Sequence, residues 1–149
     1  PATVCGVSPR MRLDLTVNIL TYNAIKNNII NVFGGKQIRP NIHINDMVDI
    51  YCFFLKKKIP TGIYNAGFEN MSVISIAKLV SNITGAKIEV QKSNDPRSYR
   101  LDSSKLLKRG FKPKYSVETG IEDVIKFTKS TKILKSFFSV KWLKDLSIK

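Results

Sequence analysis

Hydrophobic and polar residues follow two different periods along the chain, so that predicted helices alternate with predicted strands. Leu13, Val17, Leu20 and Ala24 lie on one face of a helix predicted over residues 13–26. Further helices are predicted at residues 46–57, 73–84, 103–109 and 117–128. Strands are predicted at residues 1–6, 29–33, 41–44, 62–66 and 87–90. This alternation is typical of an α/β fold.

Capping residues mark the ends of several of these helices. Asn45, Ser72 and Ser116 each stand before a helix, where a side-chain oxygen can accept a hydrogen bond from a free backbone N–H. Gly85 follows the helix at 73–84 and suits the left-handed conformation that ends many helices. Pro60 stops the helix at 46–57. These helix boundaries are therefore predicted from local residues.

Residues 32–46, VFGGKQIRPNIHIND, place an arginine between a glycine turn and a strand. Gly34 and Gly35 permit a tight turn in which the backbone approaches a flat ligand closely, because glycine tolerates positive φ and has no Cβ. The guanidinium of Arg39 can donate two parallel hydrogen bonds to phosphate oxygens, which a lysine cannot do. The segment is therefore a candidate anion site. An ordinary surface arginine in a hairpin is the alternative.

Composition predicts one domain, since 149 residues with 43% hydrophobic content can bury a core. No run of about 18 apolar residues and no signal-peptide pattern occurs, so no membrane span is predicted. Cys5 and Cys52 lack a CxxC spacing, which favours reduced thiols in a cytoplasmic protein over disulfides or a zinc site. His43 is the only histidine and is predicted to be structural, so no metal site is expected.

A formal net charge of +14 would attract nucleic acid or an anionic membrane surface. The charge is mostly lysine, however, and is spread along the sequence, with Lys56, Lys57 and Lys58 at a predicted helix end. No zinc spacing, recognition-helix pattern or aromatic RNA-binding motif accompanies it. We therefore expect neither a nucleic-acid nor a membrane partner. A non-catalytic, basic nucleic-acid-binding module remains the alternative of a different class.

Several segments, in order, carry a family resemblance: PATVCG at residues 1–6, SPRMRLDLTVN at 8–18, residues 32–51, YNAG at 64–67, and NDPRSYRLDSSKLLKRGFKP at 94–113. The chain resembles the C-terminal half of the extended short-chain dehydrogenase/reductases, specifically the NAD-dependent sugar-nucleotide epimerases and dehydratases. The likeness covers residues 1–128, and residues 129–149 are predicted to form a C-terminal helical extension. The resemblance implies a late parallel strand of a Rossmann-like domain plus a small mixed α/β substrate-binding domain.

The resemblance also implies site residues for a nucleotide-diphosphate sugar. Asn18 would donate to a phosphate, Arg39 would bind the diphosphate or the adjacent ribose, and Arg97 would close the diphosphate from the other side. The family's basic residue in this last loop sometimes stands earlier, at Lys92, so that Arg97 and Lys92 are both candidates. The remaining implied substrate contacts are Thr3, Asn31, Val32 and Phe33. Ala2 and Val4 would lie beside the nicotinamide ring.

The resemblance implies no catalytic residue in this chain. The family uses a tyrosine and a lysine four residues apart, and Tyr22 and Lys26 have that spacing, but they follow the first strand, whereas the family's pair precedes it. No glycine-rich turn opens a helix either. Because the chain also begins without methionine, we expect a piece of a longer protein whose N-terminal half binds NAD or NADP.

The predicted function is therefore the substrate-binding portion of an epimerase or dehydratase, inactive in isolation and homodimeric when full length. In the intact enzyme, the family's chemistry would oxidise a sugar hydroxyl by hydride transfer and later return the hydride. An NAD(P)-dependent reductase of a sugar nucleotide or of another small carbonyl is the alternative enzyme.

Overall fold

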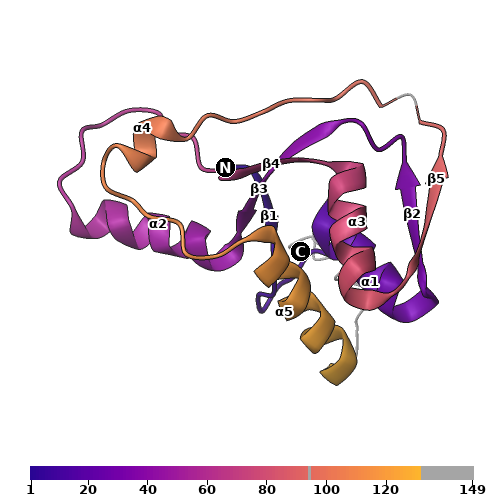
Figure 1. Ribbon diagram of the computed structural model, residues 1–149. Coiled ribbons are helices and arrows are strands. Elements are labelled where there is room, and N and C mark those ends of the chain that lie inside the picture. Colours follow the sequence, from indigo (N-terminus) through magenta and orange to yellow (C-terminus); the bar gives the residue numbers. More distant parts are fainter. Residues whose placement is uncertain (94, 132–149) are drawn as a thin grey trace, which may run out of the picture.

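The computed structural model describes residues 1–93 and 95–131, which form two small sheets and five helices (Figure 1). One sheet has the order β1 (Thr3–Cys5), β3 (Ile38–His43) and β4 (Glu69–Ser72). The other pairs β2 (Ile29–Phe33) with β5 (Lys87–Gln91). The helices are α1 (Thr16–Asn27), α2 (Ile44–Lys56), α3 (Val73–Thr84), α4 (Ser104–Leu107) and α5 (Val117–Ser130).

Pairing between distant segments builds both sheets. β1 runs parallel to β3 with Val4 opposite Ile42, whereas β3 and β4 are antiparallel. β2 and β5 are parallel, with Ile30 opposite Ile88. Figure 1 shows β2 and β5 at one end of the molecule, beyond α1 and α3, and α2 and α4 at the other end. The three-stranded sheet lies between these ends.

The main core joins α1, α3 and α5 to the inner face of β2. Its fully buried side chains include Val17, Ile30, Ile76 and Ile121, which lie at the apolar positions of their helices and strand. A second core, around Ile42, Ile50, Leu106 and Phe111, joins α2 to the α4 segment. Each end of the molecule is therefore stabilised by its own hydrophobic core.

Most predicted elements are present, and several helix ends are confirmed. Ser72 accepts a hydrogen bond from the N–H of Ser75 at the start of α3, and Ser116 accepts one from Thr119 at the start of α5. Gly85 has φ 77° and ends α3 in the left-handed conformation. β2 has the predicted bounds, and α5 extends two residues beyond the predicted end at 128. Local capping decides where α3 and α5 begin and where α3 ends.

Several predicted boundaries are wrong, including those of β1 (predicted 1–6), α2 (predicted 46–57) and α4 (predicted 103–109). Residues 62–66 are not a strand; instead Glu69–Ser72, which has no apolar alternation, forms β4 because it lies against the exposed edge of β3. α1 begins at Thr16 rather than at residue 13, and Leu13 is buried ahead of the helix. β3 begins at Ile38 and therefore includes Arg39 and Pro40, since pairing with β4 extends it.

His43, rather than Asn45, caps α2. Its Nδ1 accepts a hydrogen bond from the backbone N–H of Asn45, and its Nε2 lies 3.3 Å from a carboxylate oxygen of Asp123. The ring stacks on Tyr115 at 4.8 Å between centroids. A Cβ on Gly6 would stand 2.8 Å from Nε2, so only glycine fits there. His43 is thus buried and caps α2, which is consistent with the structural role predicted for it.

Among residues 1–93 and 95–131 there is no helix suited to crossing a bilayer. The longest described helix, α5, has 14 residues and a strongly polar face.

Candidate functional site

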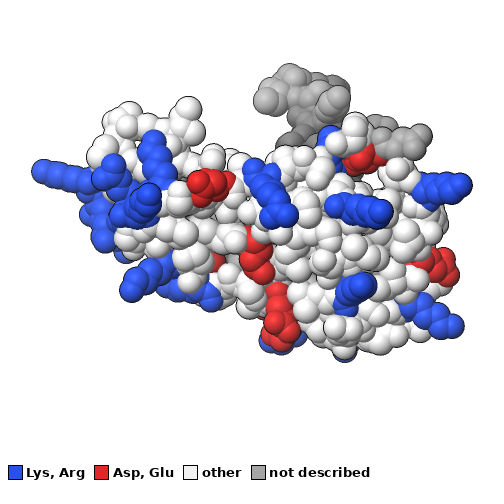
Figure 2. Space-filling view, turned by 45° about the horizontal axis from the view of Figure 1, so that its top comes forward, with Lys and Arg blue, Asp and Glu red and all other residues white. Residues whose placement is uncertain are grey.

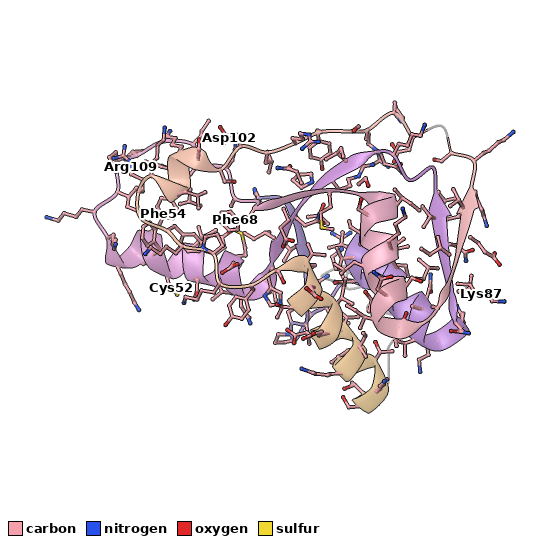
Figure 3. All side chains as sticks on the ribbon, in the orientation of Figure 1. Cys52, Phe54, Phe68, Lys87, Asp102 and Arg109 are labelled. Carbon is pink, nitrogen blue, oxygen red and sulfur yellow. The ribbon has the colours of Figure 1, made fainter. Side chains whose placement is uncertain are left out.

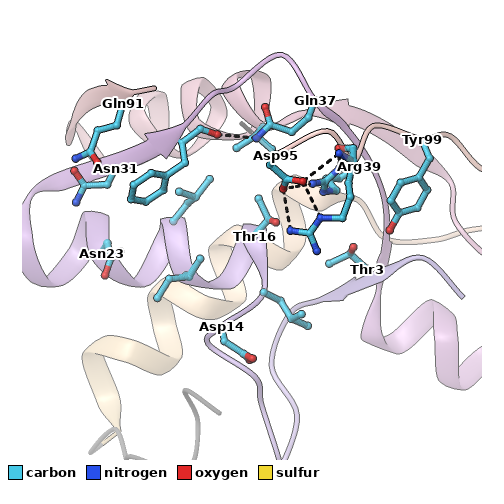
Figure 4. A pocket seen from close by; sticks show the side chains of 16 residues that line it. Thr3, Asp14, Thr16, Asn23, Asn31, Gln37, Arg39, Gln91, Asp95 and Tyr99 are labelled. Carbon is cyan, nitrogen blue, oxygen red and sulfur yellow. Dashed lines mark hydrogen bonds and ion pairs between the residues drawn. The ribbon is translucent and has the colours of Figure 1, made fainter. Parts of the chain in front are cut away.

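A cleft of about 530 Å³ lies between the first turns of α1, the ends of β2 and β5, and the start of β3 (Figure 4). Its volume is typical of sites for small organic ligands. Segments distant in sequence meet there, since β1, α1, the glycine turn and the segment after β5 all contribute to its wall. The polar and aromatic residues that line it include Thr3, Asn31, Phe33, Gln37, Arg39, Gln91, Asp95, Arg97 and Tyr99.

Two arginines converge on one carboxylate in this cleft. Nη2 of Arg39 donates to Oδ2 of Asp95 at 2.9 Å, while Nε and Nη2 of Arg97 donate to Oδ1 and Oδ2 at 2.8 and 2.9 Å (Figure 4). Nη1 of Arg39 also donates to the backbone carbonyl of Arg97 and, at 3.2 Å, to that of Ile38. The structure therefore brings together two predicted site residues that are 58 positions apart.

The two guanidinium groups differ in exposure. The Arg39 side chain is 11% exposed and is held from two sides, whereas that of Arg97 is 77% exposed. The hydrogen bonds from Arg97 lower the pKa of Asp95 to about 2, and the same carboxylate raises the pKa of Arg97. Asp95 is therefore ionised at neutral pH. It is the negative group that both arginines face in this structure.

A second carboxylate of the lining is already paired. Asp14 accepts two hydrogen bonds from the guanidinium of Arg12, at 3.0 and 2.7 Å, and these lower its pKa. Its negative charge is thus balanced by a residue outside the cleft lining. Asp95 is therefore the acid whose charge opposes an anion at the two arginines.

The glycine turn has the tight, positive-φ conformation that the sequence predicted, and its neighbours Phe33 and Gln37 line the cleft. Gly34 and Gly35 have φ of 78° and 106°, conformations that other residues rarely adopt. Gln37 bridges the turn, because its Oε1 accepts from the N–H of Gly35 at 2.6 Å and its Nε2 donates to the carbonyl of Phe33 at 2.7 Å. The ring of Phe33 is 55% exposed and lines the cleft. The turn therefore presents an aromatic side chain to the cleft.

The segment after β5 supplies residues that sequence reasoning missed. The hydroxyl of Ser98 accepts from the N–H of Ile38 at 3.0 Å, and the N–H of Tyr99 donates to the carbonyl of Ile38 at 3.3 Å. These bonds hold the segment along the start of β3. The ring of Tyr99 then lies 5.7 Å from the Arg39 guanidinium carbon. Asp95 and Tyr99 each lie two residues from Arg97 in the DPRSY motif. This closeness to a predicted site residue was the sequence signal that could have identified them.

The structure does not bring Asn18 or Val32 into this cleft. Asn18 is buried, its Oδ1 accepts from the N–H of Gly6 at 3.2 Å, and its Nδ2 donates to the carbonyl of Arg12 at 2.9 Å. These two hydrogen bonds hold the loop at residues 6–12 against α1, and they explain why a polar side chain is buried in this helix. Val32 is fully buried in the main core, because alternation along β2 turns it away from the side that Asn31 and Phe33 face.

The other predicted site residues have different locations. Thr3 lines the cleft, whereas Lys92 lines a shallow hollow beside Gly34 and Val90 rather than the cleft that holds Arg39 and Arg97. Ala2 packs into the second core, and a Cβ on Gly67 would stand 2.5 Å from its methyl group. Val4 lines a smaller cavity of about 190 Å³ that Asn18 also borders.

A glycine-rich turn that opens a helix, which marks a Rossmann-type dinucleotide site, does not occur in the part of the chain that the structure describes. The turn at Gly34 and Gly35 leads into a strand, and the residues before α1, α2, α3 and α5 are Leu15, His43, Ser72 and Ser116. Within residues 1–93 and 95–131, no three His, Cys, Asp or Glu side chains are grouped to hold a metal. The chemistry that this cleft supports is recognition of an anion.

Comparisons with known proteins agree with the fold described above. No family model matches the chain. An NAD-dependent NDP-hexosamine 5,6-dehydratase of tunicamycin biosynthesis superposes with a TM-score of 0.74 at 23% identity, over 88% of this chain and 44% of that one. This chain is structurally similar to NAD-dependent sugar-nucleotide epimerases and dehydratases. The resemblance inferred from sequence is confirmed at that level.

Two epimerases extend the comparison. The UDP-glucuronic acid 4-epimerase from Bacillus cereus, solved with UDP-glucuronic acid and NAD, gives a TM-score of 0.71 at 28% identity, over 86% of this chain and 43% of that one. The UDP-glucose 4-epimerase from Thermus thermophilus, solved with NAD, gives 0.72 at 21% identity, over 88% and 45%. This chain therefore spans less than half the length of each of the three proteins. Its mixed α/β fold resembles part of a Rossmann-type short-chain dehydrogenase/reductase domain.

Proposed function

We propose that residues 1–128 are the substrate-binding, C-terminal portion of an NAD(P)-dependent sugar-nucleotide epimerase or dehydratase. In this proposal the cleft binds a nucleotide-diphosphate sugar, and NAD or NADP is held mainly by a preceding half of a longer, homodimeric protein. Residues 129–149 are the proposed extension; α5 includes the first two, and residues 132–149 lie outside the described part of the chain.

The observation that carries the proposal is the shared target of Arg39 and Arg97. Both guanidinium groups donate to the same carboxylate, Arg39 from the start of β3 and Arg97 from the segment after β5, and two guanidinium groups directed at one place suit a diphosphate. A diphosphate carries more negative charge and more acceptor oxygens than the Asp95 carboxylate. It can therefore displace Asp95 from the arginines, or bind to them beside it. In this role Arg39, held by two backbone carbonyls, fixes the phosphate position, and the exposed Arg97 closes over it.

The other end of the cleft is suited to a nucleotide base. The exposed ring of Phe33 offers a stacking surface, and the amide side chains of Asn31 and Gln91 line the cleft from neighbouring parallel strands. Amide groups can both donate and accept, as the edge of a base requires. We propose that these three residues hold the base, while the sugar points toward Thr3 on β1.

This part of the protein orients and neutralises the substrate but does not move a proton or hydride. Tyr22 packs against the small core around Met11, Leu13 and Val124 and is not placed in the cleft. The isolated chain is therefore expected to bind sugar nucleotides without turning them over.

Calorimetry or thermal shift with a panel of UDP-, GDP-, CDP- and dTDP-sugars tests the proposal. At least one sugar nucleotide should bind with 1:1 stoichiometry, and Arg97→Ala should weaken binding about tenfold or more through the lost charge-assisted hydrogen bonds. Lys92→Ala, which removes a nearby cation outside the cleft, is the matched control. Stabilisation by oligonucleotides and by no sugar nucleotide would refute the proposal.

A further inference from the structure

One end of the molecule carries exposed cations that the cleft does not use. Lys56, Lys57 and Lys58 follow one another at the end of α2. Lys105, Lys108, Arg109 and Lys112 come from α4 and the loop after it. Figure 2 shows lysine and arginine side chains gathered at the left end of the molecule, and Figure 3 places Arg109 at that end and Lys87 at the other. We refer to residues 55–63 and 104–112 together as the basic end.

Acidic residues are absent from both segments of the basic end. Seven cations in these 18 residues therefore account for half of the formal net charge of +14. The sequence prediction treated the charge as spread, and the two segments are indeed more than 40 residues apart in sequence. Folding brings them together, which concentrates the positive potential on one surface.

Contacts hold the two segments side by side. Nζ of Lys105 donates to the carbonyl of Ile63 at 2.8 Å and lies 4.5 Å from the centroid of the Tyr64 ring. The Phe53 ring packs edge-on against the Phe111 ring, with 5.6 Å between their centroids. The ammonium of Lys57 lies 4.9 Å from the centroid of the Phe53 ring. The two segments that carry the cations are therefore packed against each other and form one surface.

Aliphatic side chains project among these cations. Leu55 is 87% exposed and Ile63 is 85% exposed, and Leu107 is 41% exposed beside Lys108. Exposed aliphatic groups ringed by lysines are typical of surfaces that rest on a bilayer, where the cations bind headgroups and the apolar groups enter the acyl boundary. A surface for single-stranded nucleic acid would instead present aromatic rings for stacking.

We propose that the basic end is a docking surface for an anionic phospholipid bilayer. The lysines and Arg109 contact lipid phosphates, and Leu55 and Ile63 insert between the headgroups. The surface lies across the molecule from β2 and β5, which carry the base end of the cleft, so bilayer and small-ligand binding are compatible (Figure 1). This proposal does not depend on the identity of the cleft ligand.

Co-sedimentation of the full chain with vesicles tests it. Vesicles of phosphatidylcholine with about a third phosphatidylglycerol should bind the chain, and pure phosphatidylcholine should not. The triple variant Lys56→Gln, Lys58→Gln, Arg109→Gln should bind at least about tenfold more weakly, given the contribution of each cation near an anionic surface. The control Lys36→Gln, Lys78→Gln, Lys87→Gln removes the same charge elsewhere and should change binding less than about threefold. All variants keep residues 132–149.

A second variant, Leu55→Ser with Ile63→Ser, separates insertion from charge. It keeps every cation, and it should lose the part of the binding that persists at high salt. Circular dichroism confirms that each variant is folded, as expected for exposed positions. Equal losses in the two charge variants, or failure to bind anionic vesicles, would overturn the proposal. Tighter binding to a duplex oligonucleotide, indifferent to Leu55 and Ile63, would overturn it in favour of nucleic acid.

Discussion

Replacing Arg39 by alanine should weaken sugar-nucleotide binding about 10- to 100-fold. In the structure Nη1 of Arg39 is engaged by two backbone carbonyls, so the group free to exchange Asp95 for a ligand phosphate is Nη2. One charge-assisted hydrogen bond contributes about 1.5 to 3 kcal/mol, and each 1.4 kcal/mol corresponds to a factor of ten. Since the Arg39 side chain is only 11% exposed, solvent screens this bond little.

Titration calorimetry with the tightest-binding sugar nucleotide from the panel measures the change. Lys36→Ala is the matched control, because Lys36 is an exposed cation in the same turn and does not itself line the cleft. Arg39→Lys should give an intermediate loss, since an ammonium keeps the charge but cannot hold the carbonyls and a phosphate at once. Asp95→Asn should instead strengthen binding, because it removes the carboxylate that competes for both arginines.

Two results would contradict this reasoning. If Arg39→Ala binds within about twofold of the unchanged chain, the guanidinium is not a phosphate ligand. If Asp95→Asn weakens binding as much as Arg39→Ala does, Asp95 positions the arginines rather than competing with the ligand.

Three further predictions follow from buried or paired groups. Asp95 has a pKa of about 2, below its ordinary value of 3.8, so its ion pairs should stabilise the fold fully above pH 3.8 and be lost as the pH falls through 2. NMR titration of the carboxyl should show that midpoint, and Asp95→Asn should remove this part of the acid response. Asp46 is fully buried and accepts from the N–H groups of Lys114 and Tyr115 at 2.9 and 3.1 Å, so Asp46→Ala should lower the free energy of unfolding by roughly 3 to 5 kcal/mol in urea denaturation. Asp49→Ala, which breaks only an exposed pair with the Lys114 ammonium, should change it little; equal losses would contradict the argument. Burial raises the pKa of Cys5 to about 12, whereas Cys52 is exposed, so a thiol reagent at neutral pH should modify Cys52 in the native chain and Cys5 only after denaturation. Rapid modification of both thiols would show that the core around Cys5 opens readily.

Local pattern was sufficient for much of the fold. The helices at α3 and α5 begin at a serine that caps them, and α3 ends at Gly85, because these contacts span at most four residues. The predicted strand at 62–66 failed for the opposite reason. β4 forms at Glu69–Ser72 without an apolar pattern, since its partner is β3, about 30 positions earlier.

The candidate site, too, was predictable from local sequence only in part. Arg39, Arg97 and the glycine turn were recognisable from their residues and from the family resemblance. The side chains of Asn18 and Val32 face the interior, and this depends on which face of α1 and β2 the rest of the fold covers.

The sequence by itself therefore determined the turn, the capped helices and the chemical types available for an anion site. Only the tertiary structure decided that Arg39 and Arg97 share one carboxylate, and that two basic segments form one surface. The physical reason is that both results depend on pairing across long stretches of chain. β2 against β5 and β3 against the segment at 98–99 bring together groups whose separation in sequence carries no local signal.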